Sequence, residues 1–288
     1  MNRNVATCLR EGIHLLESAQ VPEARLSAEE LLAHVLGKPR FALYLNPEEP
    51  LNDQNNRRFQ KFLKERTLRY PLQYLIRTIP FRESVLEIGE GCLIPRPETE
   101  MLIDVILGRL GSESERVHIL DAGTGSGNIA ISLAQEQPEW FVTATDISRE
   151  ALRYAKINAE RNQVSDRIRL IQTDLWAGIE GSFDALVSNP PYLTELDLSR
   201  LQPEIEFEPR VALNGGKGGL LFFKRMIYDA QTILKADGFV FFEVGVGQTI
   251  LVSEMLKSNG FHSIQISKDN SGIDRFISAR LGNSNGSR

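Results

Sequence analysis

The sequence predicts an α/β domain with a mostly parallel sheet, preceded by a small all-helical domain. Three observations lead to this prediction. Apolar residues recur at helical spacing over residues 1–78, strand and helix patterns alternate from Glu98 onward, and a triple-glycine loop joins one of these strands to the next helix. Such alternation favours a mostly parallel twisted sheet with helices on both faces and, here, an antiparallel strand at the C-terminal end.

The helical domain is expected to span residues 1–78. Ser27 and Glu30 have the spacing of a capping box ahead of the second helix, and Gly37 suits the end of that helix. Residues 79–96 have period-2 stretches around a glycine-rich turn, which predicts a β-hairpin linker.

The α/β domain is expected to span residues 97–282, before a disordered tail at 283–288. The predicted strands are residues 117–121, 140–145, 167–174, 183–189 and 238–245. The predicted helices are residues 127–134, 149–162 and 220–235. Two further strands, 261–267 and 274–281, are expected to pair as a terminal hairpin.

Composition and charge exclude several classes of protein. The chain has 288 residues, of which 42% are hydrophobic and 25% charged, and its net charge of −5 does not suit a general nucleic-acid binder. No apolar run approaches the roughly 20 residues of a membrane span, and the N-terminus does not have the pattern of a signal peptide. Two distant cysteines and four scattered histidines predict neither a disulfide scaffold nor a metal site. We therefore expect a cytoplasmic protein without a metal.

One local excess of positive charge has two interpretations. Between residues 57 and 82 only Glu65 opposes eight cations, namely Arg57, Arg58, Lys61, Lys64, Arg66, Arg69, Arg77 and Arg82. Such a run is usually a solvated helix face, and this is the interpretation that we favour. The alternative is a docking surface for an acidic partner.

The segment DAGTGSGN, residues 121–128, follows a strand and opens a helix, as a nucleotide-binding loop does. Gly123, Gly125 and Gly127 allow positive φ and let the backbone approach a ligand closely. The spacing is not G-x-G-x-x-G, and no Lys-Ser/Thr pair follows as in a P-loop. Asp121 would repel a pyrophosphate and suits a cationic ligand, such as an ammonium or sulfonium group.

Aspartates end three successive predicted strands, at the edge where open α/β sheets bind ligands. Asp121 is the first, Asp146 can accept both hydroxyls of a ribose, and Asp174 can meet an adenine amino group. Each aspartate alone is readily explained as a cap. Three of them around a triple-glycine loop favour a binding site. The ligand that fits is S-adenosylmethionine, and the fold is then that of a class I S-adenosylmethionine-dependent methyltransferase.

The segment SNPPYL, residues 188–193, ends the fourth strand at the same edge. Its prolines have no N–H, so the backbone offers carbonyl acceptors. Asn189 Oδ1 and the Pro190 carbonyl can hold both hydrogens of a planar NH₂ group, while Tyr192 packs against its face. Because that nitrogen lone pair is otherwise delocalised, holding both hydrogens out of plane frees it to attack a methyl group. The corner predicts N-methylation of an exocyclic or amide NH₂.

Adenine in DNA and glutamine in protein both offer such a nitrogen. An adenine N6 DNA methyltransferase must flip its base and bind a polyanion, which calls for a basic face and a target-reading module. The net charge of −5 and the small helical domain do not favour this alternative. A non-catalytic S-adenosylmethionine-binding module is a third possibility. The intact Asn-Pro-Pro-Tyr segment argues against it, because a binder has no nucleophile to hold.

The chain resembles the peptide chain release factor N5-glutamine methyltransferases over nearly its whole length. The matching stretches are EARLSAEELLAHVLG (23–37), YPLQYL (70–75), IPRPETE (94–100), DAGTGSGNIAISLA (121–134), SNPPY (188–192), FEPRVAL (207–213) and FEVGVGQ (242–248). The resemblance implies a helical substrate-docking domain, a hairpin linker and a class I catalytic domain. It implies as substrate the glutamine of the Gly-Gly-Gln motif in class I release factors, with no direct contact to nucleic acid or membrane.

The resemblance also implies roles for individual residues. Those expected to bind S-adenosylmethionine are Gly123, Thr124, Gly125, Ser126, Gly127, Asp146, Asp174, Leu175 and Asn189. Those expected to bind the glutamine are Asn189, Pro190, Pro191 and Tyr192, with Asn189, Pro190 and Tyr192 as the catalytic residues. Arg96 and Glu98 either shape the mouth of the pocket or form a salt-bridged linker.

The sequence departs from this family at three positions outside the proposed chemistry. Arg77 stands where a glycine is usual, and Asn214 and Lys217 stand where aspartates are usual. The departures concern the linker and the docking surface rather than the reaction.

Overall fold

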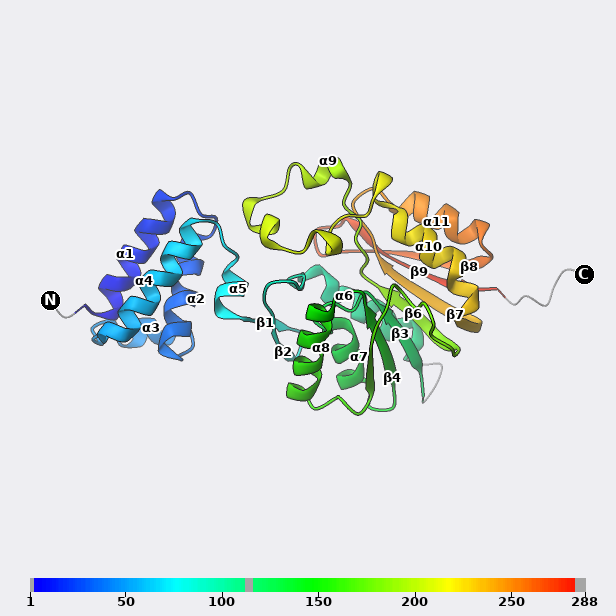
Figure 1. The fold of residues 1–288 in the computed structure, drawn as a ribbon, viewed down its shortest axis with the longest axis horizontal. Coiled ribbons are helices and arrows are strands. Elements are labelled where there is room, and N and C mark those ends of the chain that lie inside the picture. The colour runs from blue at the N-terminus through cyan, green and yellow to red at the C-terminus, as the bar shows by residue number, and fades with distance from the viewer. Residues whose placement is uncertain (1–2, 112–115, 283–288) are drawn as a thin grey trace, which may run out of the picture. The chain divides into compact units, whose positions relative to one another are not determined.

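The computed structural model describes residues 3–111 and 116–282, which fall into two compact units (Figure 1). The first unit comprises Met1–Thr78 together with Gln202–Phe207, and the second comprises Ile79–Leu201 and Glu208–Arg288. Residues 202–207, which the sequence assigns to the domain 97–282, therefore cluster with the helical unit instead. The predicted tail, 283–288, lies outside the described residues.

The first unit is helical and has a core of its own. Its helices are α1 (Val5–Ser18), α2 (Ala24–Leu36), α3 (Ala42–Leu45), α4 (Asp53–Thr67) and α5 (Leu72–Ile76). Leu16, Leu31 and Phe59 are among the fully buried side chains at its centre. The predicted capping box is wrong: α2 begins at Ala24, so Ser27 lies inside the helix, where its hydroxyl accepts a hydrogen bond from Arg66 Nε at 3.3 Å. Gly37 ends the helix as predicted, with φ of +63°.

The remaining elements, apart from short 3₁₀ turns, alternate between strands and helices. The strands are β1 (Thr78–Phe81), β2 (Ser84–Glu87), β3 (His118–Ala122), β4 (Phe141–Asp146), β5 (Ile168–Gln172), β6 (Phe183–Ser188), β7 (Leu234–Glu243), β8 (Phe261–Lys268) and β9 (Asp274–Leu281). The helices are α6 (Glu98–Leu110), α7 (Asn128–Glu136), α8 (Arg149–Arg161), α9 (Glu195–Leu198), α10 (Leu221–Asp229) and α11 (Thr249–Ser258).

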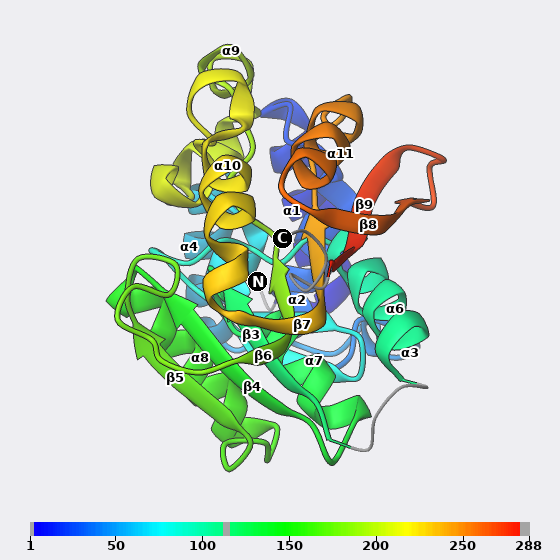
Figure 2. The ribbon, with the colours of Figure 1, turned by 90° about the vertical axis from the view of Figure 1, so that its right-hand side faces the viewer.

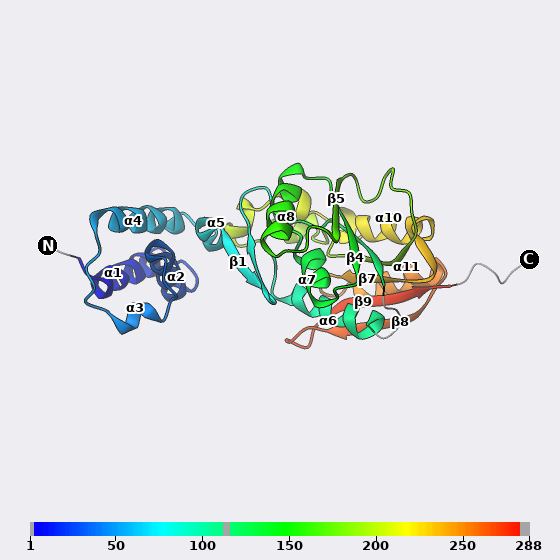
Figure 3. The ribbon, with the colours of Figure 1, turned by 90° about the horizontal axis from the view of Figure 1, so that it is seen from below.

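A seven-stranded sheet has the order β5-β4-β3-β6-β7-β9-β8, and β1 pairs separately with β2 (Figures 1 and 3). Every pair from β5 to β7 is parallel, whereas β9 runs antiparallel to both β7 and β8. The predicted fold class is confirmed, including the antiparallel C-terminal strand and the terminal hairpin. Because the parallel strands end at one edge, this topology brings their C-terminal residues together.

Alternate residues of the central strands enter two different cores. Phe239 and Phe241 of β7 pack with α6, α7 and α8, while Val240 and Phe242 pack with α10 and α11. These two groups of helices lie on opposite faces of the sheet (Figure 2). Period-2 alternation of this kind is what a sheet covered on both faces requires. None of the helices within the described ranges is long and apolar enough to cross a membrane.

Several predictions in the α/β part need correction. The helix expected at 220–235 ends at Asp229, and a 3₁₀ turn then leads into β7 at Leu234 rather than at residue 238. Helices α6 and α11 were not predicted, although both bury apolar residues such as Leu102 and Val252. The predicted 167–174 strand is shorter, so Asp174 lies two residues beyond the end of β5.

Candidate active site

A cavity of about 200 Å³ lies within the second unit, where β3, β4 and β6 end. The predicted site residues that line it are Gly123, Thr124, Gly125, Ser126, Asp146, Asp174, Leu175, Asn189, Pro190 and Pro191. Gly127 and Tyr192 are not among its lining residues. The strand order thus brings together most of the residues that the sequence singled out, from segments up to 68 positions apart (Gly123 to Pro191).

The glycine loop forms an open cradle on one side of this cavity. Gly123 and Gly125 have φ of +76° and +58°, and a Cβ at either would meet nothing within 4 Å, since it would stand in open space. A Cβ at Gly127 would instead approach Ala155 Cα at 3.3 Å and Ala155 Cβ at 3.2 Å. Gly123 and Gly125 therefore leave room for a ligand, while Gly127 allows α7 and α8 to pack closely.

Backbone amides hold the Asp146 carboxylate in place. Its Oδ2 accepts from the Gly125 N–H at 2.9 Å, and its Oδ1 accepts from the Ser148 N–H at 2.8 Å. Burial raises the pKa of Asp146, while these backbone hydrogen bonds act in the opposite direction. Each oxygen has a further lone pair, so the fixed carboxylate can still accept from ligand hydroxyls.

The other two aspartates have different surroundings. Asp121 is fully buried beneath the loop and does not line the cavity. Its Oδ2 accepts from Thr124 Oγ1 at 2.6 Å, while its Oδ1 has no hydrogen-bond partner among the described residues. Asp174 does line the cavity, and its Oδ2 also pairs with Arg225 at 2.8 Å. The sequence did not single out Arg225, which is another lining residue.

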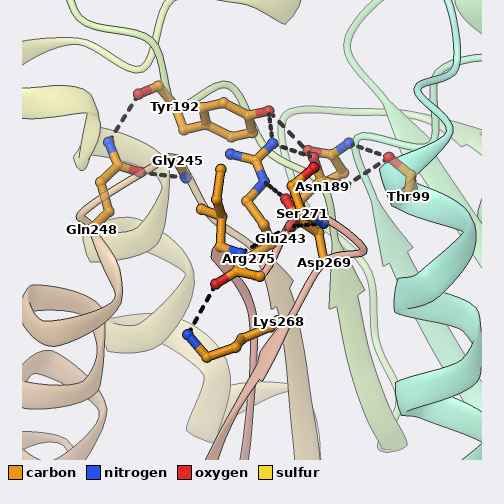
Figure 4. A network of polar contacts seen from close by, with 12 residues as sticks. Thr99, Asn189, Tyr192, Glu243, Gly245, Gln248, Lys268, Asp269, Ser271 and Arg275 are labelled. Atoms are coloured by element: carbon orange, nitrogen blue, oxygen red, sulfur yellow. Dashed lines mark hydrogen bonds and ion pairs between the residues drawn. The ribbon is translucent and has the colours of Figure 1, made fainter.

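Asn189 and Tyr192 are held by neighbouring side chains, of which Thr99 also lines the cavity (Figure 4). Asn189 Nδ2 donates to Thr99 Oγ1 at 3.0 Å, so Oδ1 is the amide atom left to accept from a ligand. The Tyr192 hydroxyl donates to Glu243 Oε1 at 3.2 Å and accepts from Arg275 Nη2 at 3.0 Å. Burial, followed by the nearby Glu243 charge, raises the pKa of Tyr192 to about 12, so this hydroxyl stays protonated at neutral pH.

Arg96 lines the cavity and is also salt-bridged, so both interpretations of this residue hold. Its Nη2 lies 2.6 Å from Oε1 of the buried Glu208, whose Oε2 accepts from the Ile94 N–H at 2.9 Å. Glu208 thus joins the segment before α6 to the one after the Asn-Pro-Pro-Tyr corner. Glu98 is not among the lining residues.

Half of the eight cations in the basic stretch have structural partners. Arg66 and Arg69 both pair with Glu204, Arg82 pairs with Glu136 and Asp104, and Lys61 lies 3.8 Å from Glu65. The solvated or structural interpretation therefore accounts for these four cations. The docking alternative stays a prediction that concerns the exposed residues Arg57, Arg58, Lys64 and Arg77.

Comparison with known proteins decides the family. Residues 7–76 match the PrmC N-terminal domain, and residues 98–207 match the Methyltransferase small domain. The chain is 36% identical over 285 residues to the release factor glutamine methyltransferase of Chlorobaculum tepidum, and the match covers 96% of each chain. The chain belongs to the release factor glutamine methyltransferase family. The Synechocystis member is 41% identical over 220 residues, which is 74% of each chain.

A solved structure supports the fold independently. The fold is similar to that of a methyltransferase from Pyrococcus furiosus, with a TM-score of 0.53 and 23% identity, and the match covers 70% of this chain and 91% of that chain. At this identity the likeness concerns the fold alone.

Three residues of this family member were missed by sequence reasoning as parts of the site. Thr99, Glu243 and Arg275 make hydrogen bonds to Asn189 or Tyr192, yet they lie on α6, β7 and β9. Thr99 and Glu243 fall within the RPETE and FEVGVGQ stretches that carry the family resemblance. Their place in these stretches was the signal that the sequence offered. Only the sheet order shows that they lie beside the Asn-Pro-Pro-Tyr corner.

The stretch 213–220, which contains two departures from the family pattern, packs against the same corner. A Cβ at Gly215 would lie 2.7 Å from the Pro191 carbonyl oxygen, and one at Gly219 would collide with the Tyr192 carbonyl. Asn214 Nδ2 donates to Glu195 Oε1 at 2.8 Å. An asparagine can make this bond to a carboxylate, whereas an aspartate would repel Glu195.

Proposed function

We propose that this protein transfers a methyl group from S-adenosylmethionine to the side-chain amide nitrogen, N5, of the glutamine in the Gly-Gly-Gln motif of class I release factors. The observation that supports the proposal most directly is the orientation of the Asn189 side-chain amide. Its NH₂ is bound to Thr99, and its carbonyl oxygen remains to accept from a substrate beside the Pro190 carbonyl, which has no competing N–H donor next to it.

The residues at the cavity fit S-adenosylmethionine as the methyl donor. Gly123 and Gly125 leave space that a Cβ would fill, and the Asp146 carboxylate is fixed with lone pairs free for ribose hydroxyls. Leu175 and the exposed Ile147 add apolar surface to the lining. When bound, S-adenosylmethionine supplies a methyl group on a positively charged sulfur, ready for direct displacement.

The protein's contribution to the transfer is to orient the nucleophile. Asn189 Oδ1 and the Pro190 carbonyl accept the two amide hydrogens, and Tyr192, held by Glu243 and Arg275, supports the shape of the corner. Fixing both hydrogens turns the nitrogen lone pair toward the methyl group, and such positioning can lower a barrier by several kcal/mol, on the order of 7. No strong base is required, because the proton can leave after the methyl group has been transferred.

A transfer assay with radiolabelled S-adenosylmethionine tests the proposed reaction. Three substrates are compared: a purified class I release factor, the same factor with Gln→Ala in its Gly-Gly-Gln motif, and unmethylated duplex DNA. We expect label only on the unaltered release factor. Label on DNA would make adenine the substrate of the corner, and the proposal would then be wrong.

Asn189→Ala separates an enzyme from a cofactor-binding module. Because the Asn189 carbonyl is the acceptor for the nucleophile, while the glycine loop and Asp146 remain to bind the donor, we expect kcat to fall about 100-fold or more, as for the loss of an essential positioning group. We expect the Kd for S-adenosylmethionine, measured by calorimetry, to change only a few-fold. A variant with full transfer activity would show that the corner does not hold the substrate amide.

The finer predictions concern location and partners. The relatives are named for release factors, which makes a release factor the expected protein partner of this chain. The cytoplasmic location, the helical unit's role in docking, and the lack of direct nucleic-acid contact stay predictions.

A further inference from the structure

We infer that Thr99 and Glu243 are positioning residues that fix which end of the Asn189 side-chain amide faces the substrate. The inference rests on the proposed function and deepens it. It concerns a question that the Asn-Pro-Pro-Tyr segment leaves open by itself. The two ends of an asparagine amide have nearly the same size, but one accepts hydrogen bonds and the other donates them.

Only one of the two amide orientations suits the reaction. A substrate NH₂ brings two donors, so it needs two acceptors, which are Asn189 Oδ1 and the Pro190 carbonyl. A flipped Asn189 would present its own NH₂ to the substrate NH₂. Two donors would then face each other, and the substrate hydrogen would be left unpaired in a partly buried site.

The Thr99 hydroxyl decides the orientation because it has a single hydrogen. Thr99 lies in the first turn of α6 with 1% of its surface exposed. Its Oγ1 donates to Glu243 Oε2 at 2.7 Å. Burial raises the pKa of Glu243, whereas this hydrogen bond and the charge of Arg275 act in the opposite direction, and in its ionised form the carboxylate can only accept. The hydroxyl must therefore act as an acceptor toward Asn189, whose Nδ2 lies 3.0 Å away. This forces the carbonyl oxygen of Asn189 to the other side.

The Glu243 carboxylate determines the direction of these two hydrogen bonds. It is the last residue of β7 and is fully buried, and the β6–β7 register pairs Ser188 with Phe242, one residue before Asn189 and Glu243. Its second oxygen, Oε1, accepts from the Tyr192 hydroxyl at 3.2 Å and lies 3.5 Å from Arg275 Nη2. One buried carboxylate thus orients both the first and the last residue of the Asn-Pro-Pro-Tyr corner (Figure 4).

Removing only the Thr99 hydroxyl tests the inference. Thr99→Val keeps the shape of the side chain but gives Asn189 no acceptor, whereas Thr99→Ser keeps the hydroxyl and alters the shape. We expect Thr99→Val to lower kcat for release factor methylation about tenfold or more, the range for loss of one hydrogen bond in a buried site. We expect its KM for the release factor and its Kd for S-adenosylmethionine to stay within about threefold. Thr99→Ser should restore most of the lost kcat.

Thr249→Val is the matched control, because Thr249 is also a buried threonine at the start of a helix, with 5% of its surface exposed. Its kcat should equal that of the unaltered protein, and thermal unfolding of all variants reports any loss of folding. A Thr99→Val kcat within threefold of the unaltered protein, or a Thr99→Ser variant as impaired as Thr99→Val, would overturn the inference. Failure of the unaltered protein to methylate the release factor would instead overturn the proposed function, and the inference with it.

Discussion

At the scale of single residues, buried charge shapes the cofactor side of the site. Burial raises the pKa of Asp121 from 3.8 to about 7; the Thr124 hydrogen bond opposes this shift, and the nearby Asp146 adds to it. Because the folded-state pKa lies above the unfolded one, the stability that this group contributes is fully present below about pH 4. That stability is lost as the pH rises through about 7. Above neutral pH, the buried charge of Asp121 therefore destabilises the folded protein.

Asp121→Asn should therefore stabilise the ligand-free protein at alkaline pH. A shift of about three pKa units corresponds to roughly 4 kcal/mol at most, so we expect the unfolding temperature at pH 8 to rise by several degrees. At pH 5 the difference should be smaller, since Asp121 is then largely protonated in the folded protein. Thermal unfolding followed by circular dichroism at both pH values measures this. A variant that is equally destabilised at pH 5 and pH 8 would contradict the account.

Individual site residues were predicted from the sequence where chemistry is local. The triple-glycine loop and the Asn-Pro-Pro-Tyr segment are short contiguous motifs, so their ligand-binding residues can be predicted without the fold. Gly123, Gly125 and Asn189 do line the cavity. Gly127 could not be separated from its neighbours, because its contact with Ala155 depends on how α7 packs on α8. Thr99 and Glu243 could not be assigned because their partners in the corner are distant in sequence: Asn189 is 90 residues from Thr99, and Tyr192 is 51 residues from Glu243.

At the scale of elements, the periodicity of apolar residues predicted the type of most helices and strands but not their limits. The start of α2 was misplaced because Ser27 with Glu30 imitates a cap, while tertiary packing with Arg66 uses the serine inside the helix. The helix at 220–235 was extended too far, because Ile233 and Leu234 continue a helical apolar pattern into the strand. Boundaries depend on the partners of each end, which the local pattern does not contain.

Arg77, the position where the family usually has glycine, ends α5 in a strained conformation. Its φ is +60°, and its N–H donates to Gln73 O at 2.7 Å. Since a left-handed conformation costs a non-glycine residue about 1 kcal/mol, Arg77→Gly should raise the free energy of unfolding by about 0.5 kcal/mol after the added entropy of the unfolded chain. Arg77→Ala, which keeps the strain, is the control. Urea unfolding measures the stability of both variants. An Arg77→Gly protein that is less stable than the Arg77→Ala protein would contradict this expectation.

At the scale of the whole molecule, the chain passes between its two units three times, at residues 78–79, 201–202 and 207–208. The segment Gln202–Phe207 joins the helical unit through Glu204, whose carboxylate meets Arg69 Nη2 at 2.6 Å and the buried Arg66 at 2.9 Å. Burial would raise the pKa of Glu204, but the hydrogen bonds from Arg69 and Arg66 outweigh it, so the pKa is lowered. The sequence predicted two domains but not this return of the chain, since pairing over 138 positions leaves no local signal.

Glu204→Ala should loosen this connection and destabilise the helical unit. Arg66 would stay buried without its carboxylate, which costs roughly 1–3 kcal/mol. Because the Glu204 pKa is lowered in the folded state, its contribution is present above the unfolded pKa and is lost as the pH falls. Glu206→Ala, an exposed glutamate in the same segment, is the control. Hydrogen exchange of residues 202–207 should accelerate in the first variant only, and equal rates in both would disprove the role of Glu204.

The most direct test of the central claim is to locate the methyl group on the product. A class I release factor is incubated with the protein and S-adenosylmethionine, digested, and sequenced by tandem mass spectrometry. The account predicts a single methyl group on the glutamine side chain of the Gly-Gly-Gln motif, and none after treatment with Asn189→Ala. A methyl group on another residue, or equal methylation by both proteins, would contradict the assignment of the Asn-Pro-Pro-Tyr corner as the holder of the substrate amide.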